Sequence, residues 1–242
     1  MQKSSHTLPA LETADQWRIV CDFDGTITPF DVTDAILERF ADKEWEVIER
    51  QWTDGHITAR ICMERQIGLI SAPVAEFNDF LDQIPVTKGF AEFLKYCRSR
   101  SLGLLVVSDG MDYVIRRILG RHGFAQVQVV ANRLLMDGRG GYRLEFPFSR
   151  AECPSGVCKC AVAGSNGDIL LIGDGLSDCC LAGRAAMTLA RRDKALQEYC
   201  ELNGRPYLVY DDFFDISAKL ETLLSTLPGK QEPSAEWLPC PA

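Results

Sequence analysis

Short apolar runs that end in acidic or small polar residues recur along the chain. Residues 17–22, 102–107 and 168–172 are three such runs, and each reaches or precedes Asp or Ser. Continuous apolar runs of this length are typical of strands buried on both faces of a parallel sheet. Residues 89–100 and 111–122, which lie between runs, have apolar positions at helical spacing. The alternation predicts an α/β fold, a parallel sheet with helices on both faces.

Two further stretches refine this pattern. Residues 127–130 predict a short strand, and two apolar runs separated by glycines within residues 134–144 predict a hairpin. Residues 31–85 depart from the alternation directly after the first strand: they have helical spacing and turn signals at Asp54-Gly55 and around Pro73. We interpret them as several packed helices that form a separate lobe, a cap inserted into the sheet domain.

The expected domain limits follow from these elements. The catalytic core should comprise residues 15–30 and 86–225, and the helical cap residues 31–85. The segment 226–242 contains several prolines and is expected to be a flexible tail.

The composition narrows the possible partners. The chain has 242 residues, with 26 Lys and Arg against 34 Asp and Glu, so its net charge is −8. Proteins that bind nucleic acid usually carry a basic face, so a nucleic-acid partner is not expected. No apolar run reaches the roughly 18 residues that a membrane span needs, and the N-terminus lacks an apolar signal core. We expect a cytoplasmic protein without a membrane partner, in which most of the 10 cysteines are free thiols.

Acidic residues follow the first and third runs. Asp22 and Asp24 are two positions apart, so in an extended segment their side chains point the same way. One carboxylate could attack a phosphorus atom, and the other could protonate the leaving oxygen and later deprotonate water. Because adjacent carboxylates repel one another, the pair favours a bound cation. Mg²⁺ fits where phosphate is also a ligand, and Asp174 could complete its coordination.

Ser108 and Lys159 could bind the phosphate of such a substrate. A serine hydroxyl before Gly110 can donate to a phosphate oxygen, and a fixed lysine can neutralise its charge. Each motif alone also fits an ordinary turn or a solvated lysine. A calcium loop is a further alternative for residues 22–33, but Thr33 occupies the position where such a loop has Glu.

Together, in this order along the chain, these motifs resemble those of the haloacid dehalogenase superfamily. The resemblance covers residues 19–224 and is strongest to the phosphoserine phosphatase-like branch. It implies a Rossmann-like sheet, Mg²⁺ dependence and phosphoester hydrolysis through an aspartyl-phosphate. The resemblance implies that Asp22 is the nucleophile and Asp24 the general acid and base. It implies that the metal ligands are Asp22, Asp174 and the backbone carbonyl of Asp24. The phosphate binders would be Ser108, Lys159 and the backbone of Asp109 and Gly110, with Asp178 and Ser177 as supporting residues.

Within this branch, Ser108 to Tyr113 and the cysteines near Lys159 look like the 2-hydroxy-3-keto-5-methylthiopentenyl-1-phosphate phosphatases of methionine salvage. The expected substrate is therefore a small phosphorylated metabolite of this type. Phosphoserine is the second candidate, and a sugar phosphate, phosphocholine or pyridoxal phosphate comes next. The chain departs from both patterns. Compared with methionine-salvage enzymes, the stretch 159–173 is several residues shorter and the cysteine spacing differs. Compared with phosphoserine phosphatase, the positions that bind the substrate carry other residues. The candidate cap residues for substrate choice are Asp31, Arg65 and Gln66, and Trp45 and Trp52 could also line the pocket.

The sequence leaves alternatives for the cysteines near Lys159 and for the function of the chain. Cys153, Cys158 and Cys160 could bind zinc, form a disulfide or remain free thiols, of which the last is favoured. The chain could also be a regulatory binding protein on the same fold, or a phosphatase of protein substrates. The complete acidic set argues against the first, and the sizeable cap argues against the second. A homodimer is plausible.

Overall fold

The computed structural model describes residues 17–164 and 169–226. Seven strands form one sheet in the order β4-β3-β2-β1-β5-β6-β7. All neighbours are parallel except β3 and β4, so the predicted α/β fold class is confirmed. The strands are β1 Arg18–Cys21, β2 Gly103–Met111, β3 Gln128–Met136, β4 Tyr142–Glu145, β5 Ile169–Gly173, β6 Met187–Arg191 and β7 Tyr207–Tyr210.

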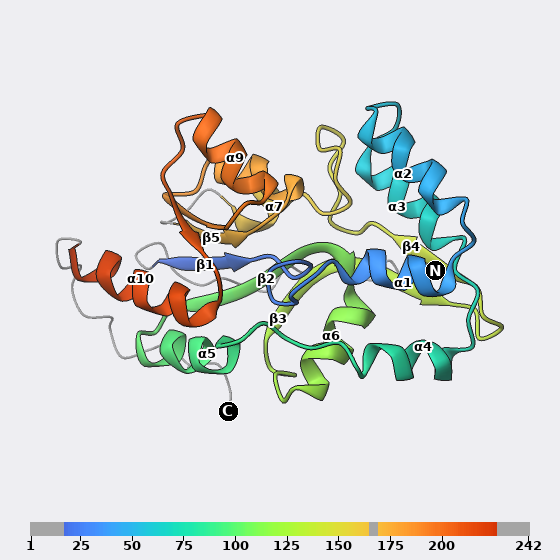
Figure 1. The fold of residues 1–242 in the computed structure, drawn as a ribbon, viewed down its shortest axis with the longest axis horizontal. Coiled ribbons are helices and arrows are strands. Elements are labelled where there is room, and N and C mark those ends of the chain that lie inside the picture. The colour runs from blue at the N-terminus through green and yellow to red at the C-terminus, as the bar shows by residue number, and fades with distance from the viewer. Residues whose placement is uncertain (1–16, 165–168, 227–242) are drawn as a thin grey trace.

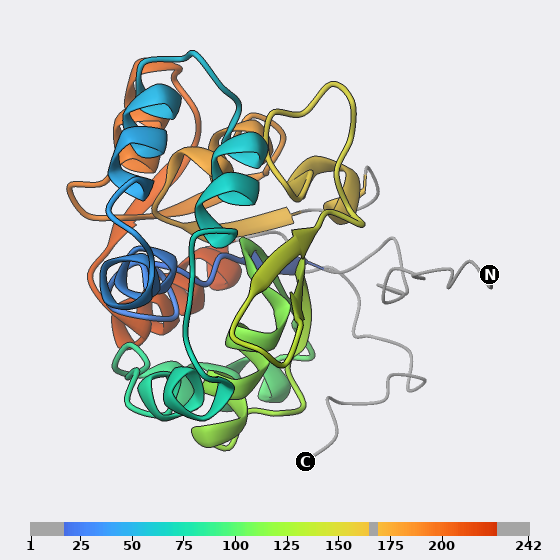
Figure 2. The same ribbon diagram turned by 90° about the vertical axis from the view of Figure 1, so that its right-hand side faces the viewer.

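Helices cover both faces of the sheet (Figures 1 and 2). One face packs against α5 Phe90–Ser99, α6 Asp112–Arg121 and α10 Phe213–Thr226. The other packs against α7 Lys159–Ala163, α8 Cys179–Ala182 and α9 Ala195–Leu202. The apolar run of β1 serves both faces, because Ile19 and Cys21 join the first hydrophobic cluster and Val20 joins the second. Such a strand has no solvent face, which explains its lack of polar alternation.

Four helices lie between β1 and β2: α1 Val32–Phe40, α2 Trp45–Thr53, α3 Ala59–Ile67 and α4 Val74–Leu81. Some of their apolar side chains belong to the hydrophobic core of the sheet domain. Ile36 of α1 and Phe77 of α4 belong to the same hydrophobic cluster as the helices under the sheet. The pair α2 and α3 rises beyond the end of β1 (Figure 1). The domain limits proposed from the sequence stay a prediction.

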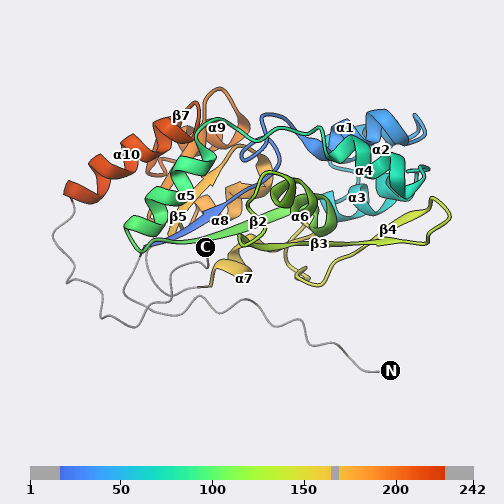
Figure 3. The same ribbon diagram turned by 90° about the horizontal axis from the view of Figure 1, so that it is seen from below.

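Strand β3 is longer than predicted. The short strand expected at residues 127–130 and the first strand of the expected hairpin are one strand, Gln128–Met136, whose second half pairs with β4. The polar Asn132 does not interrupt it, because this buried side chain donates a hydrogen bond to the carbonyl of Asp109. The hairpin extends under α3 and α4 (Figure 3), where the Tyr142 hydroxyl donates to the Ala72 carbonyl at 3.0 Å. The hairpin thus supports the inserted helices.

Within residues 17–164 and 169–226, no helix combines the length and the apolar character that crossing a bilayer requires. The tail expected at 226–242 lies, beyond Thr226, outside the described residues.

Candidate active site

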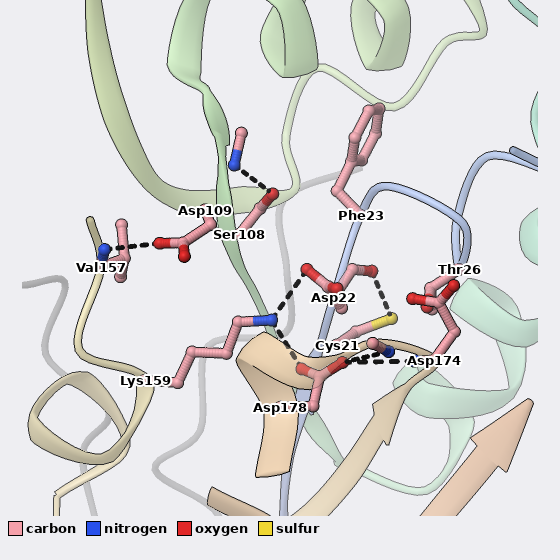
Figure 4. A network of polar contacts seen from close by, with 12 residues as sticks. Cys21, Asp22, Phe23, Thr26, Ser108, Asp109, Val157, Lys159, Asp174 and Asp178 are labelled. Carbon is pink, nitrogen blue, oxygen red and sulfur yellow. Dashed lines mark hydrogen bonds and ion pairs between the residues drawn. The ribbon is translucent and has the colours of Figure 1, made fainter. Parts of the chain in front are cut away.

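Three strand ends meet at the centre of the sheet, because β1 lies between β2 and β5. Asp22 follows β1, and its backbone N–H donates to the Ile172 carbonyl of β5 at 2.8 Å. Ser108 lies in β2, just where the pairing of β2 with β3 becomes irregular. Asp174 follows β5 directly. The structure therefore brings together side chains that are up to 152 positions apart, counting from residue 22 to residue 174 (Figure 4).

Lys159 is the fixed cation of this site. Its side chain is only 1% exposed, and Nζ lies 2.9 Å from Asp22 Oδ1 and 2.6 Å from Asp178 Oδ1. Burial alone would lower the lysine pKa, but attraction to Asp178 and Asp22 outweighs burial and raises it. Lys159 is therefore charged at any physiological pH. The short helix α7 begins at this residue.

Asp178 is fully buried and serves to position its neighbours. One of its oxygens accepts from Lys159, and the other accepts the backbone N–H groups of Asp174 and Gly175 at 3.2 Å each. These bonds fix the turn that follows β5. Asp178 thus lies where the sequence placed a supporting residue.

An acidic cluster adjoins this lysine. Carboxylate oxygens of Asp22, Asp174 and Asp178 all lie within 4.8 Å of one another, a spacing that could hold a metal ion. Burial, followed by repulsion from Asp178, raises the pKa of Asp22 well above its ordinary value and that of Asp174 to about 6. A hard cation with oxygen ligands would relieve this repulsion. Both oxygens of Asp178 accept from Lys159 or from backbone N–H groups, whereas Lys159 contacts one oxygen of Asp22, so Asp22 and Asp174 would be the better ligands.

Asp24 lies opposite, where β1 meets the inserted helices. Its Oδ1 accepts the Val32 N–H at the start of α1 at 2.9 Å. Burial and then repulsion from Asp31 raise its pKa well above the ordinary value. A carboxyl with a raised pKa can hold a proton near neutral pH and give it to a leaving group.

Gly110 lets Asp24 approach β2. A Cβ at position 110 would lie 2.6 Å from Asp24 Oδ2, closer than side chains pack. We expect Gly110→Ala to displace the Asp24 carboxyl and to lower kcat by roughly 10²-fold, the scale of one misplaced catalytic group. Gly103→Ala, in the same strand, meets nothing within 4 Å and is the control. Steady-state assays of both variants with an aryl phosphate would check this. Equal activity of the two would contradict it.

Ser108 and Asp109 contribute in different ways. Ser108 is 1% exposed, and its Oγ accepts the Gly110 N–H at 2.9 Å, so the hydroxyl proton is left to donate. The Asp109 carboxylate points to the loop before Lys159 and accepts the Val157 N–H at 2.6 Å (Figure 4). The sequence assigned only backbone near the phosphate to Asp109. The structure adds a role for the Asp109 side chain, which holds the loop before Lys159 in place.

A cavity of about 1020 Å³ opens from these residues toward the inserted helices. Asp31, Gln66 and Ser177 line it, and so does Trp52. Arg65 is not among its lining residues: this side chain is exposed, and its guanidinium donates to Gln51. Several further lining residues, among them Asp34, Glu49 and Lys194, belong to no motif of the sequence.

The cysteines near Lys159 are free thiols in the structure. Burial, followed by further contributions from neighbouring thiols, raises the pKa of Cys180 to about 12, and burial also raises that of Cys153. Within the described residues, the group of three or more possible metal ligands is the aspartate cluster, which includes no cysteine.

Known proteins match both the sequence and this fold. A family model described as haloacid dehalogenase-like hydrolase matches residues 19–183, more than half of the chain. The chain belongs to this hydrolase family. A 2-hydroxy-3-keto-5-methylthiopentenyl-1-phosphate phosphatase of Exiguobacterium sp. (strain AT1b) is 30% identical over 212 residues, which cover 84% of this chain and 96% of the relative. The protein of the same name from Exiguobacterium sibiricum is 31% identical over 215 residues, covering 85% and 96%.

Solved structures show the same fold in this hydrolase family. A phospho-aspartyl intermediate analogue of phosphoserine phosphatase has a TM-score of 0.63 at 21% identity, over 87% of this chain and 99% of that chain. A phosphoserine phosphohydrolase-like protein from Francisella tularensis has a TM-score of 0.64 at 18% identity, over 85% and 100%. The predicted superfamily, fold and phosphatase class of this haloacid dehalogenase-like hydrolase are thereby confirmed.

Proposed function

We propose that the chain is a Mg²⁺-dependent phosphomonoester hydrolase that acts on a small metabolite through an aspartyl-phosphate on Asp22. The observation that carries the proposal is the position of Lys159, buried between Asp22 and Asp178 and beside Asp174. A lysine held there neutralises the charge of the nucleophile and of an incoming phosphate. The family to which the chain belongs supports the same chemistry.

In the first half of the reaction, a carboxylate oxygen of Asp22 attacks the phosphorus atom. The bond from phosphorus to the leaving oxygen breaks, and Asp24 gives that oxygen its proton. Ser108 and Lys159 donate hydrogen bonds to the phosphoryl oxygens, where negative charge is spread.

In the second half, the Asp24 carboxylate takes a proton from a water molecule, which attacks the same phosphorus atom. The bond between phosphorus and Asp22 breaks, inorganic phosphate leaves, and Asp24 is protonated again. Residues of the inserted helices α1, α2 and α3 line the cavity in which these steps would take place.

The donor set fits a magnesium ion. Asp22, Asp174 and the backbone carbonyl of Asp24 would hold it, because these are oxygen donors on adjacent strand ends. When bound, Mg²⁺ screens the nucleophile from the phosphate and stabilises the charge that develops in transfer.

Substrates can be ranked from the comparisons. The relatives named above are phosphatases of 2-hydroxy-3-keto-5-methylthiopentenyl-1-phosphate, which makes this compound the first candidate, as the sequence motifs also suggested. Phosphoserine, phosphocholine, sugar phosphates and pyridoxal phosphate follow. A cavity of about 1020 Å³ is sized for a small metabolite.

The test is a panel of these phosphomonoesters, with an aryl phosphate as the generic substrate, assayed with Mg²⁺ and with EDTA. We expect phosphate release with Mg²⁺ and none with EDTA, and addition of excess Mg²⁺ should restore it. Release that EDTA does not affect would contradict the metal requirement. No release from any compound would contradict the phosphatase itself.

The metal requirement should depend on pH. The pKa of Asp174, raised to about 6, exceeds its value in the unfolded chain, so protons compete with Mg²⁺ below about pH 6. We expect the Mg²⁺ concentration for half-maximal activity to rise as the pH falls from about 7 to 5. In the metal-free protein, the proton on Asp174 stabilises the fold at low pH, and this stabilisation is lost as the pH rises through about 6. Mg²⁺ should therefore raise the Tm more at about pH 7.5 than at about pH 5. Equal shifts of the Tm at the two pH values would contradict the assignment of Asp174 as a ligand.

A further inference from the structure

The part of the cavity beyond the phosphate site is acidic. Asp31, Asp34 and Glu49 line it, and Lys194 is the one lysine or arginine among its lining residues in the described chain. His56 is the remaining basic group there. The same cavity joins this region to Asp22, so it offers space for the leaving group of a substrate bound there.

The carboxylates repel one another. Partial desolvation, followed by repulsion from Asp31 and Glu49, raises the pKa of Asp34 to about 7. A neutral leaving group would leave this repulsion in place, and an anionic one would increase it. A positive charge would lower it.

Two buried side chains hold the Glu49 carboxylate in place. Gln66, which is 3% exposed, donates its amide to Glu49 Oε2 at 2.8 Å and to the Trp45 carbonyl at 3.3 Å. The buried Cys62 thiol donates to the same carboxylate oxygen at 3.6 Å. A solvated surface carboxylate has no need of two buried donors. They fix the direction in which Glu49 faces the cavity.

These hydrogen bonds also change the role expected for Gln66. Its amide N–H groups are committed to Glu49 and Trp45, so it acts through Glu49 rather than on the substrate. Arg65, the alternative partner for a substrate carboxylate, is exposed and bonded to Gln51 outside the cavity lining. The cavity therefore offers carboxylates for a cation and lacks an arginine for an anion.

We propose that the leaving group of the substrate carries a positively charged nitrogen, which Glu49 and Asp34 bind, and that Gln66 positions Glu49 for this contact. The substrate class is then an aminoalkyl or quaternary-ammonium alkyl phosphate without a carboxylate. This inference rests on the proposed phosphatase function. It departs from the substrate in the relatives' names, which carries no positive charge.

The experiment compares substrates matched in shape but not in charge. Phosphocholine is paired with its neutral tert-butyl analogue, and O-phosphoethanolamine with propyl phosphate, all assayed with Mg²⁺. We expect the wild-type kcat/KM to be at least roughly tenfold higher for each cationic member, chiefly through a lower KM. Glu49→Gln and Gln66→Leu should reduce this ratio, the first more than the second. Glu46→Gln, an exposed acid on the same helix and not among the lining residues, should keep it.

Binding decides the inference separately from turnover. Calorimetry on the Asp22→Asn protein with Mg²⁺ should give a lower Kd for phosphocholine than for its neutral analogue, and Glu49→Gln added to it should remove the difference. Equal affinities, or a preference that survives Glu49→Gln, would overturn the cation site. Absence of hydrolysis for every compound would instead overturn the phosphatase function, whatever the binding result.

Discussion

Replacing Asp22 by Asn should abolish Mg²⁺-dependent phosphatase activity while the protein remains folded. Asparagine has the same shape but is not a nucleophile, so the aspartyl-phosphate cannot form. Loss of a nucleophile typically costs on the order of 10⁴-fold or more in kcat. The fold should persist because Lys159 keeps its second partner, Asp178, at 2.6 Å, which leaves one positive and one negative charge buried together.

The measurement is release of phosphate from an aryl phosphate by wild type and by Asp22→Asn, with thermal unfolding of both. Asp79→Asn, an exposed aspartate of α4, is the matched control and should behave as wild type. Acid-quenched wild type supplied with radioactive substrate should retain labelled phosphate, and Asp22→Asn should not. Undiminished turnover by a folded Asp22→Asn protein would rule out this nucleophile.

Much of the sheet could be predicted because its central strands have no solvent face. The central residues of these strands, 19–21 in β1, 104–107 in β2 and 169–172 in β5, are all apolar and buried, a pattern typical of strands covered on both faces. The strand predicted at residues 127–130 was too short, because β3 continues through the polar Asn132. Its amide has a hydrogen-bond partner 23 positions away, at the carbonyl of Asp109, and a local pattern cannot contain that partner.

The inserted helices illustrate the same limit. Their helical spacing was visible, but the direction of their apolar faces was not. Phe77 of α4 stacks against Tyr142 of β4, with ring centroids 4.8 Å apart, so the hairpin and the helices share one core. The sequence does not say which apolar surface a helix covers, so this shared core could not be predicted, and the limits of the cap stay a prediction.

The candidate site divides along similar lines. Asp22, Asp24 and Asp174 could be found because they follow strands directly, and the ends of neighbouring parallel strands meet at one edge. Glu49 could not, since it is one acid of a charged helix whose sequence does not distinguish it from Glu46. Its place in the cavity lining and the hydrogen bonds that it accepts from the buried Gln66 and Cys62 set it apart.

Replacing Lys159 by Met should both inactivate and destabilise the protein. Methionine fills a similar volume, but Asp22 and Asp178 would then be two buried carboxylates without their cation. Breaking a buried ion pair by removing one partner costs about 3–5 kcal/mol, because the remaining charge is uncompensated. Urea unfolding of the metal-free protein should show this loss, and Lys194→Met, which removes an exposed lysine at the rim of the cavity, should leave the free energy of unfolding near that of wild type.

The double variant Asp22→Asn/Lys159→Met separates charge from packing. If the loss in Lys159→Met comes from unpaired carboxylates, removing the charge of Asp22 should recover part of it, so the double variant should be more stable than Lys159→Met alone. If the loss came from poor packing of the methionine, the double variant would be no more stable than the single one. A measured coupling near zero between positions 22 and 159 would therefore contradict the view that Lys159 stabilises this site by its charge.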